Sequence, residues 1–263
     1  MPYRVEISCP PQEALDVLIQ LGALDLEPVQ DGLAAILPDG VAPDSVARAL
    51  GISSIGVSNA VARDAGSVWL LSPRGVKIGG VVIAPPEAAA SPNTLRLIDS
   101  NAFGTGHHPT TALCIEAMEE ILSVEGVDSV LDVGTGSGIL ALTALILGVA
   151  QAVALDIDAD ALKVAMENAR LNNLEKRLQL IPGGPDLVHG TWPLVVANVA
   201  AAPLMDMAPV LVRRVASRGR LVLSGIASCL ECEVRRVYQH FGVRHIHSKT
   251  RAGWTVVIAQ ASW

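Results

Sequence analysis

The stretch VLDVGTGSGIL, residues 130–140, decides the fold of this chain. Its first residues are apolar and typical of a buried strand, and three glycines, Gly134, Gly136 and Gly138, follow where a helix is expected to begin. Glycine allows the tight turn and lets the backbone approach a ligand closely. We therefore expect a strand–turn–helix unit whose turn, with the first amides of the helix, faces a bound molecule.

The sequence around this unit alternates between strand and helix patterns. Strands are expected at 128–133, 152–157, 177–182, 193–198, 219–224, 243–248 and 254–260, and helices at 112–123, 138–148, 159–172, 203–216 and 229–240. Such alternation indicates a parallel sheet with crossover helices. The turn about Arg251–Gly253 is short, so the last two strands must run antiparallel. The fold class is thus α/β, with a Rossmann-like, doubly wound, seven-stranded domain.

The N-terminal residues predict a second, smaller domain. Strands are expected at 3–8, on both sides of Asp31-Gly32 within 24–37, and at 54–61, with helices at 11–21 and 44–50. The order βαββαβ is typical of a ferredoxin-like α+β domain. Residues 64–100 are rich in Gly and Pro and look irregular, with an extended segment, VVIAPP. We expect a small domain at 1–62, a linker at 63–100 and the large domain at 101–263.

Composition narrows the class of protein. The 263 residues are 51% hydrophobic but only 3% aromatic, so the core must be aliphatic, as suits parallel strands covered on both faces. The formal net charge of −7 argues against binding a nucleic-acid backbone, which requires clustered Lys and Arg. The N-terminus MPYRVEISCPP has no apolar run typical of a signal peptide, and no segment is a good membrane span. A cytoplasmic protein is expected.

The glycine turn and the strand after it predict the cofactor. The spacing is G-x-G-x-G, whereas dinucleotide-binding turns have G-x-G-x-x-G. Asp132 lies two residues before Gly134, where a carboxylate suits the ammonium of S-adenosylmethionine, directly or through water. Asp156, at the end of the strand VALDID, can accept hydrogen bonds from both ribose hydroxyls, while Asp158 is the expected cap of the following helix. The alternative to ribose binding is that Asp156 serves only as a cap.

Two further polar segments flank this predicted site. In AFGTGHHPTT, residues 102–111, Thr110 and Thr111 can cap the next helix and direct a hydroxyl to a ligand. Asn198 ends an apolar strand at the carboxyl edge of the sheet, where it can meet the cofactor or an incoming nucleophile, unless it only caps the strand. The Asn-Pro-Pro-aromatic motif of methylases acting on adenine or glutamine amides is absent, which disfavours those targets.

No metal site is expected. His107 and His108 are adjacent residues that rarely point the same way, so loop hydrogen bonding is the simpler interpretation. Cys229 and Cys232 form a lone C-x-x-C without the second ligand pair that zinc would require. We expect them to be buried thiols near the start of a helix.

These segments, in this order, resemble the bacterial ribosomal protein L11 methyltransferase family. FGTGHHPTT is the most distinctive match, followed by DVGTGSGILA, ALDIDADAL and NVAAAPL, with SGIAS and Trp254 near the C-terminus. The resemblance implies that Thr111, Gly134, Asp156 and Asn198 contact S-adenosylmethionine and that Phe103 and Thr105 shape a loop over it. Ser100-Asn101 replace the family's usual Pro-Gly, and the region around Trp69 is shortened, which bears on how the two domains are arranged.

The resulting hypothesis is methyl transfer from S-adenosylmethionine to amines of a protein. The resemblance implies lysine side chains of free ribosomal protein L11, with its N-terminal amine as a further candidate and the small domain as the substrate-recognition domain. We expect Asn198 to orient the amine. The alternatives are a methyltransferase of another protein or a small molecule, a nicotinamide-dependent dehydrogenase, and a non-catalytic binding protein of the same fold.

Overall fold

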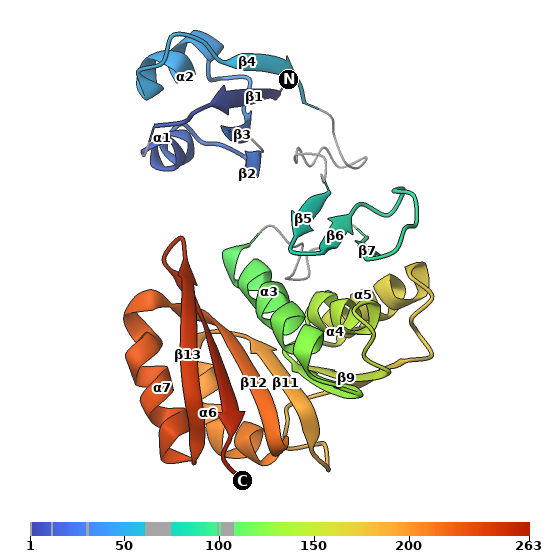
Figure 1. Cartoon of the computed structure of the whole chain (residues 1–263). Helices are drawn as coiled ribbons and strands as arrows, with labels where there is room; N and C mark the ends of the chain where they lie inside the picture. Colours follow the sequence, from blue (N-terminus) through green and yellow to red (C-terminus); the bar gives the residue numbers. More distant parts are fainter. Residues whose placement is uncertain (1, 12, 30–31, 61–74, 99, 101–107) are drawn as a thin grey trace. The chain divides into compact units, whose positions relative to one another are not determined.

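The computed structural model describes residues 2–11, 13–29, 32–60, 75–98, 100 and 108–263. The chain divides into two units, a small one from Met1 to Pro73 and a large one from Arg74 to Trp263 (Figure 1). Each is described separately below.

The small unit is a four-stranded antiparallel sheet with two helices. Its elements are β1 (Tyr3–Ser8), α1 (Ala14–Gln20), β2 (Asp25–Val29), β3 (Gly32–Leu37), α2 (Pro43–Leu50) and β4 (Gly56–Asn59). The strand order is β2-β3-β1-β4, and the element order is the βαββαβ expected from the sequence. Apolar residues of β1 and β3 pack with Leu18 of α1 and Val46 of α2, because alternate strand residues share one face of the sheet.

The large unit begins with a three-stranded sheet where the sequence predicted irregular chain. Its strands are β5 (Val76–Ile78), β6 (Val81–Ala84) and β7 (Thr94–Arg96), in the order β5-β6-β7. Buried residues of this sheet, among them Val81 and Leu95, share a core with helix α3 (Pro109–Val124). The segment VVIAPP thus contributes β6, and residues 76–97 pack in the large unit.

A seven-stranded sheet forms the centre of the large unit. Its strands are β8 (Ser129–Val133), β9 (Gln151–Asp156), β10 (Leu178–Pro182), β11 (Trp192–Asn198), β12 (Val215–Ala227), β13 (Val243–Arg251) and β14 (Trp254–Ala261). The order is β10-β9-β8-β11-β12-β14-β13, with the first five strands parallel and β14 antiparallel to both of its neighbours. The predicted doubly wound, seven-stranded α/β domain is confirmed, including its antiparallel last pair.

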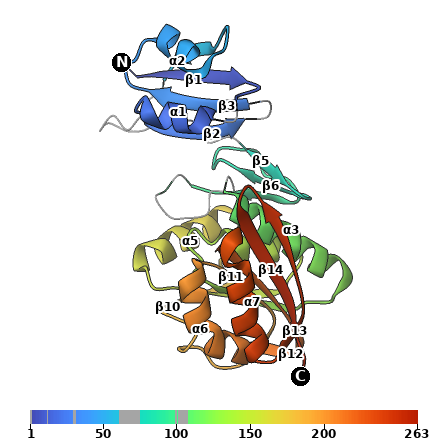
Figure 2. The ribbon, with the colours of Figure 1, turned by 90° about the vertical axis from the view of Figure 1, so that its left-hand side faces the viewer.

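Helices cover both faces of this sheet (Figure 2). The helices are α3, α4 (Ile139–Ile146), α5 (Ala159–Leu171), α6 (Ala201–Arg213) and α7 (Glu231–His240), with a short 3-10 helix, η1 (Ser228–Leu230), before α7. One core contains side chains of α3, α4 and α5, and the other contains side chains of α6 and α7. Both cores are largely aliphatic, as the low aromatic content predicts.

Several predicted boundaries are wrong, and two of them have a clear physical reason. The helix expected at 203–216 ends at Arg213, because Val215 already begins β12, which is longer than the predicted strand at 219–224. The helix expected from residue 112 begins earlier, at Pro109, since proline is favoured in the first helical turn.

Candidate functional site

The ends of four neighbouring strands form the candidate site. Register pairs Val133 of β8 with Leu155 of β9 and with Ala197 of β11, so the next residues, Asp156 and Asn198, flank Gly134 at one level. The chain order reverses direction between β8 and β11, and open α/β sheets bind ligands at such a switch point. The sequence therefore places its polar residues where this fold binds ligands.

The turn after β8 depends on its glycines. Gly134 and Gly138 have φ angles of +75° and +83°, in the left-handed region that favours glycine. A Cβ on Gly134 would lie 2.4 Å from Cγ1 of Val199, and one on Gly138 would lie 3.1 Å from Cβ of Ala165. Larger residues would therefore displace the loop after β11 or helix α5, and the turn would lose its shape.

Asp132 lies beneath this turn and is completely buried. Its Oδ2 accepts hydrogen bonds from the Thr135 hydroxyl at 2.7 Å and the Ala141 amide at 3.1 Å, while its Oδ1 has no partner among the residues that the structure describes. Burial raises the pKa of Asp132 to about 6, the hydrogen bonds from Thr135 and Ala141 oppose the increase, and the nearby Asp156 carboxylate adds to it. A buried acceptor without a partner is costly in a folded protein, and a donor from a ligand would remove that cost.

Asp156 is less buried than Asp132, and its carboxylate holds two backbone amides, one in the glycine turn and one at the start of α5. Its Oδ2 accepts from the Gly136 amide at 2.8 Å and its Oδ1 from the Asp158 amide at 3.0 Å. Each carboxylate oxygen retains a lone pair for a further donor. Asp158 caps α5 by accepting from the Asp160 amide at 2.8 Å, as predicted, so the two aspartates have separate tasks.

Asn198 is also buried, with 8% of its surface exposed. Its Nδ2 makes a long contact of 3.4 Å with Oγ1 of Thr111, and in the described part of the chain its Oδ1 has no hydrogen-bond partner. The structure thus brings Thr111 and Asn198 together although 87 residues separate them. A second unpartnered buried oxygen at the strand ends strengthens the case for a ligand with hydrogen-bond donors.

Thr110 and Thr111 do not cap α3, contrary to the prediction. Both lie inside the helix, and His108 is the N-cap, with its Nδ1 2.7 Å from Oγ1 of Thr110. The imidazole of His108 also packs edge-on against Trp254 at 5.0 Å, and burial lowers its pKa. His107 and the predicted cofactor residues Phe103 and Thr105 lie outside the described residues.

Sequence analysis did not identify Ser224, which lies within β12 and is paired with Asn198 of β11. It is buried and donates from its hydroxyl to the Thr255 carbonyl at 3.1 Å, and the thiol of Cys114 is buried near it. Burial raises the pKa of Cys114, which keeps the thiol neutral and makes it a poor nucleophile. The same sequence feature that identified Asn198 is present at Ser224: a polar residue follows a run of apolar strand residues.

The C-x-x-C cysteines are not buried, contrary to the prediction. Cys229 and Cys232 are both exposed free thiols, on η1 and the first turn of α7. Within the described part of the chain, no group of three or more His, Cys, Asp or Glu side chains could hold a metal ion. The described helices also include none that is long and apolar enough to cross a membrane.

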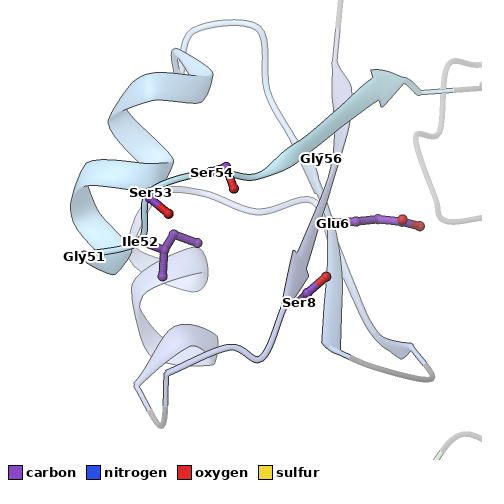
Figure 3. Close-up of a pocket in the computed structure, with 7 residues that line it drawn as sticks. All are labelled: Glu6, Ser8, Gly51, Ile52, Ser53, Ser54 and Gly56. Atoms are coloured by element: carbon purple, nitrogen blue, oxygen red, sulfur yellow. The ribbon is translucent and has the colours of Figure 1, made fainter.

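The small unit has a hollow of its own, about 500 Å³ in volume, where the end of β1 meets the loop between α2 and β4 (Figure 3). It is lined by Glu6, Ser8, Gly51, Ile52, Ser53, Ser54 and Gly56. Hydroxyl and backbone groups dominate this lining, which suits a polar chain segment better than an apolar ligand.

Comparison with known proteins assigns the family. The family model described as "Ribosomal protein L11 methyltransferase (PrmA)" matches residues 74–262. The chain belongs to the ribosomal protein L11 methyltransferase family. The match covers almost the whole large unit and contains Thr111, Asp132, Asp156 and Asn198.

Individual members of the ribosomal protein L11 methyltransferase family agree with this assignment. The chain is 38% identical over 210 residues to the ribosomal protein L11 methyltransferase of Geotalea daltonii, covering 74% of this chain and 67% of that protein. It is 31% identical to that of Myxococcus xanthus, over 99% of this chain and 98% of that protein. The crystal structure of ribosomal protein L11 methylase from Lactobacillus delbrueckii subsp. bulgaricus superposes with a TM-score of 0.65 at 28% identity, covering 72% of this chain and 99% of that chain.

Proposed function

We propose that this methyltransferase transfers a methyl group from S-adenosylmethionine to lysine amines of ribosomal protein L11. One observation carries the proposal: in a chain that belongs to this family, buried acceptor oxygens of Asp132 and Asn198 near the strand ends have no hydrogen-bond partner among the described residues. The ammonium of S-adenosylmethionine is a donor that suits Asp132, and the incoming amine is a donor that suits Asn198. This function would be carried out in the cytoplasm, where a ribosomal protein substrate is made.

The residues at the strand ends fit the cofactor by their chemistry. Asp156 would accept the ribose hydroxyls, and the Gly134–Gly138 turn would let backbone approach the cofactor closely. Asp132 would receive the ammonium, directly or through water, and Thr111 and Asn198 would complete the polar lining. By their resemblance to the family's loop FGTGHHPTT, Phe103 and Thr105 would shape a loop over the cofactor.

When bound, the cofactor supplies a methyl group on a cationic sulfonium, open to in-line attack. The chain must then align a neutral amine with that methyl. A lysine amine has an ordinary pKa of about 10.4, so it has to lose a proton first. A closed, water-poor site favours the neutral amine because burial penalises the ammonium form. The amide oxygen of Asn198, which lacks a protein partner, would accept a hydrogen bond from the amine and orient its lone pair.

The small unit would recognise the protein substrate. Residues 1–60 contain two Arg and eight Asp or Glu, a formal charge of −6, whereas residues 61–263 have a formal charge of only −1. A domain of this charge attracts a basic protein and repels nucleic acid. Its serine-lined hollow provides hydrogen-bonding groups for a polar segment of such a partner.

Methyl transfer from radiolabelled S-adenosylmethionine tests the proposal directly. We expect label in free ribosomal protein L11, on lysine residues located by mass spectrometry, and none in a variant of L11 whose lysines are replaced by arginine. Label in a different ribosomal protein would mean that the proposed substrate is wrong but that the proposed reaction, protein methylation, is right. Absence of transfer to any ribosomal protein, with cofactor binding intact, would instead favour a small-molecule substrate or a non-catalytic role.

A further inference from the structure

Helix α5 holds the glycine turn through one fully buried side chain, Asn168. Its Nδ2 donates to the Ser137 carbonyl at 2.8 Å, and its Oδ1 accepts from the Ile98 amide at 2.8 Å. Only this orientation of the amide satisfies both partners, because one offers an acceptor and the other a donor. Asn168 therefore links two segments that are 39 residues apart in the sequence.

The first of these segments is the candidate cofactor turn itself. Ser137 lies between Gly136 and Gly138, and Ala165, one helical turn before Asn168, contacts the position that a Cβ on Gly138 would occupy. On the opposite side of the turn, Asp156 holds the Gly136 amide. The turn is thus fixed from two directions, by Asp156 at the end of β9 and by Asn168 on α5.

The second segment follows β7 and leads, in the sequence, toward Phe103–Thr111. Asn172, one helical turn after Asn168, binds the last residue of β7, just before this segment: its Oδ1 accepts from the Arg96 amide at 2.9 Å and its Nδ2 donates to the Arg96 carbonyl at 2.7 Å. Its other described hydrogen bonds lie within α5, to the Asn168 and Ala169 carbonyls. Asn172 therefore holds the same segment as Asn168 but makes no described hydrogen bond to the glycine turn.

We infer that Asn168 is a positioning residue for methyl transfer, which sets the shape of the cofactor turn and fixes the segment before Phe103–Thr111 relative to it. The inference rests on the proposed function. Asn168 acts through Ser137 and Ile98 and does not touch the cofactor. If its amide is lost, the Ser137 carbonyl loses the donor that ties it to α5, and the peptide groups of the turn can reorient away from their ligand-binding arrangement.

The two asparagines allow a matched test in the full chain. Asn168→Asp keeps an acceptor for the Ile98 amide but turns an oxygen toward the Ser137 carbonyl, whereas Asn172→Asp makes the equivalent change at Arg96 without reaching the turn. Both variants are expected to lower the melting temperature. Only Asn168→Asp should weaken S-adenosylmethionine binding, by about tenfold or more, whereas Asn172→Asp should stay within about threefold of wild type.

Calorimetric titration and steady-state kinetics measure these effects. We expect Asn168→Asp to raise KM for S-adenosylmethionine more than it lowers kcat, a split that general destabilisation would not produce. Equal cofactor affinity in the two variants, with wild type binding normally, would overturn the positioning role alone. Failure of the wild-type chain to bind S-adenosylmethionine would overturn the proposed function and, with it, this role. If Asn168→Asp does not fold, Asn168→Ala and Asn172→Ala give the same comparison without an added charge.

Discussion

The two units of this chain concentrate polar groups in different ways. In the large unit, near-neutral overall, Asp132, Asn198 and Ser224 are buried close to the carboxyl edge of the sheet, and oxygens of Asp132 and Asn198 lack partners among the described residues. In the small unit the formal charge is −6, and the hollow is shallow and lined by hydroxyl and backbone groups. Buried unpartnered acceptors suit a small ligand held in one pose, whereas surface charge suits a protein partner met through long-range attraction. The difference therefore separates cofactor binding from substrate recognition.

Removal of the small unit should produce the largest effect. A chain of residues 74–263 should lose methylation of the protein target, because the groups that would attract and hold that target are gone. Its affinity for S-adenosylmethionine should change by no more than about threefold, since the proposed cofactor residues all lie in the large unit. Radiolabel transfer and calorimetry measure the two quantities on the same sample, and cofactor binding shows that the shortened chain is folded. Methylation at the full-length rate would remove the recognition role from the small unit.

Asp156→Ala should weaken S-adenosylmethionine binding by about a hundredfold, because charge-assisted hydrogen bonds to two hydroxyls and the hold on Gly136 are lost. Asp158→Ala is the matched control. It removes only the cap of α5, so it should lower the free energy of unfolding by about 1 kcal/mol and leave affinity unchanged. Similar affinities of the two variants for S-adenosylmethionine would mean that Asp156 does not bind the ribose.

The buried Asp132 should make stability and cofactor binding respond to pH in opposite ways. Its folded-state pKa of about 6 lies above the ordinary value of about 3.9, so the folded chain retains a proton that the unfolded chain releases. The free energy of unfolding of the ligand-free protein should therefore fall, by about 2 to 3 kcal/mol from this group, as pH rises from about 4 to above 6. Affinity for the cationic end of S-adenosylmethionine should rise as the carboxylate forms.

Asp132→Asn isolates this effect. An asparagine oxygen can still accept from Thr135 and Ala141, and the side chain cannot ionise. Denaturant unfolding gives the pH dependence of the free energy of unfolding, and calorimetry gives the pH dependence of cofactor affinity. Between about pH 5 and 8, both pH dependences should differ between wild type and the variant. If cofactor affinity has the same pH dependence in both proteins, Asp132 does not receive the ammonium.

Salt should have the smallest effect and should act on one unit only. Raising the ionic strength from about 0.05 to 0.5 M screens exposed charges, so KM for a basic protein substrate should rise several-fold. Affinity for the cofactor should change little because its partners are buried. Steady-state kinetics with each substrate varied in turn distinguish the two, and an unchanged KM for the protein would mean that the acidic charge of residues 1–60 is not used in recognition.

Much of the architecture could be predicted from the sequence because it follows from periodic burial. Alternating strands and helices gave the seven-stranded sheet and its antiparallel end, and Asp31-Gly32 located a hairpin in the small unit. The small sheet of β5, β6 and β7 was missed, apart from the extended segment VVIAPP, because strands of three or four residues show little periodicity among Gly and Pro. The exposed Cys229 and Cys232 were misjudged since burial of a thiol depends on packing that sequence does not show.

Some residues of the candidate site could be predicted from the sequence, and others could not. Residues at strand ends, such as Asp156 and Asn198, could be predicted because parallel strands present their carboxyl ends at one edge. Asn168 could not, because a mid-helix asparagine gives no local sign that its amide joins Ser137 to Ile98. Long-range hydrogen bonds of this kind become visible only once the chain is folded.

Cofactor choice at the strand ends can be measured by calorimetric titration of the intact chain with S-adenosylmethionine and, separately, with NAD. The strand ends offer acceptors for an ammonium and ribose hydroxyls and a G-x-G-x-G turn, so we expect saturable binding of one S-adenosylmethionine per chain and no detectable binding of NAD. Tight binding of NAD, or no binding of S-adenosylmethionine, would contradict the assignment of this site.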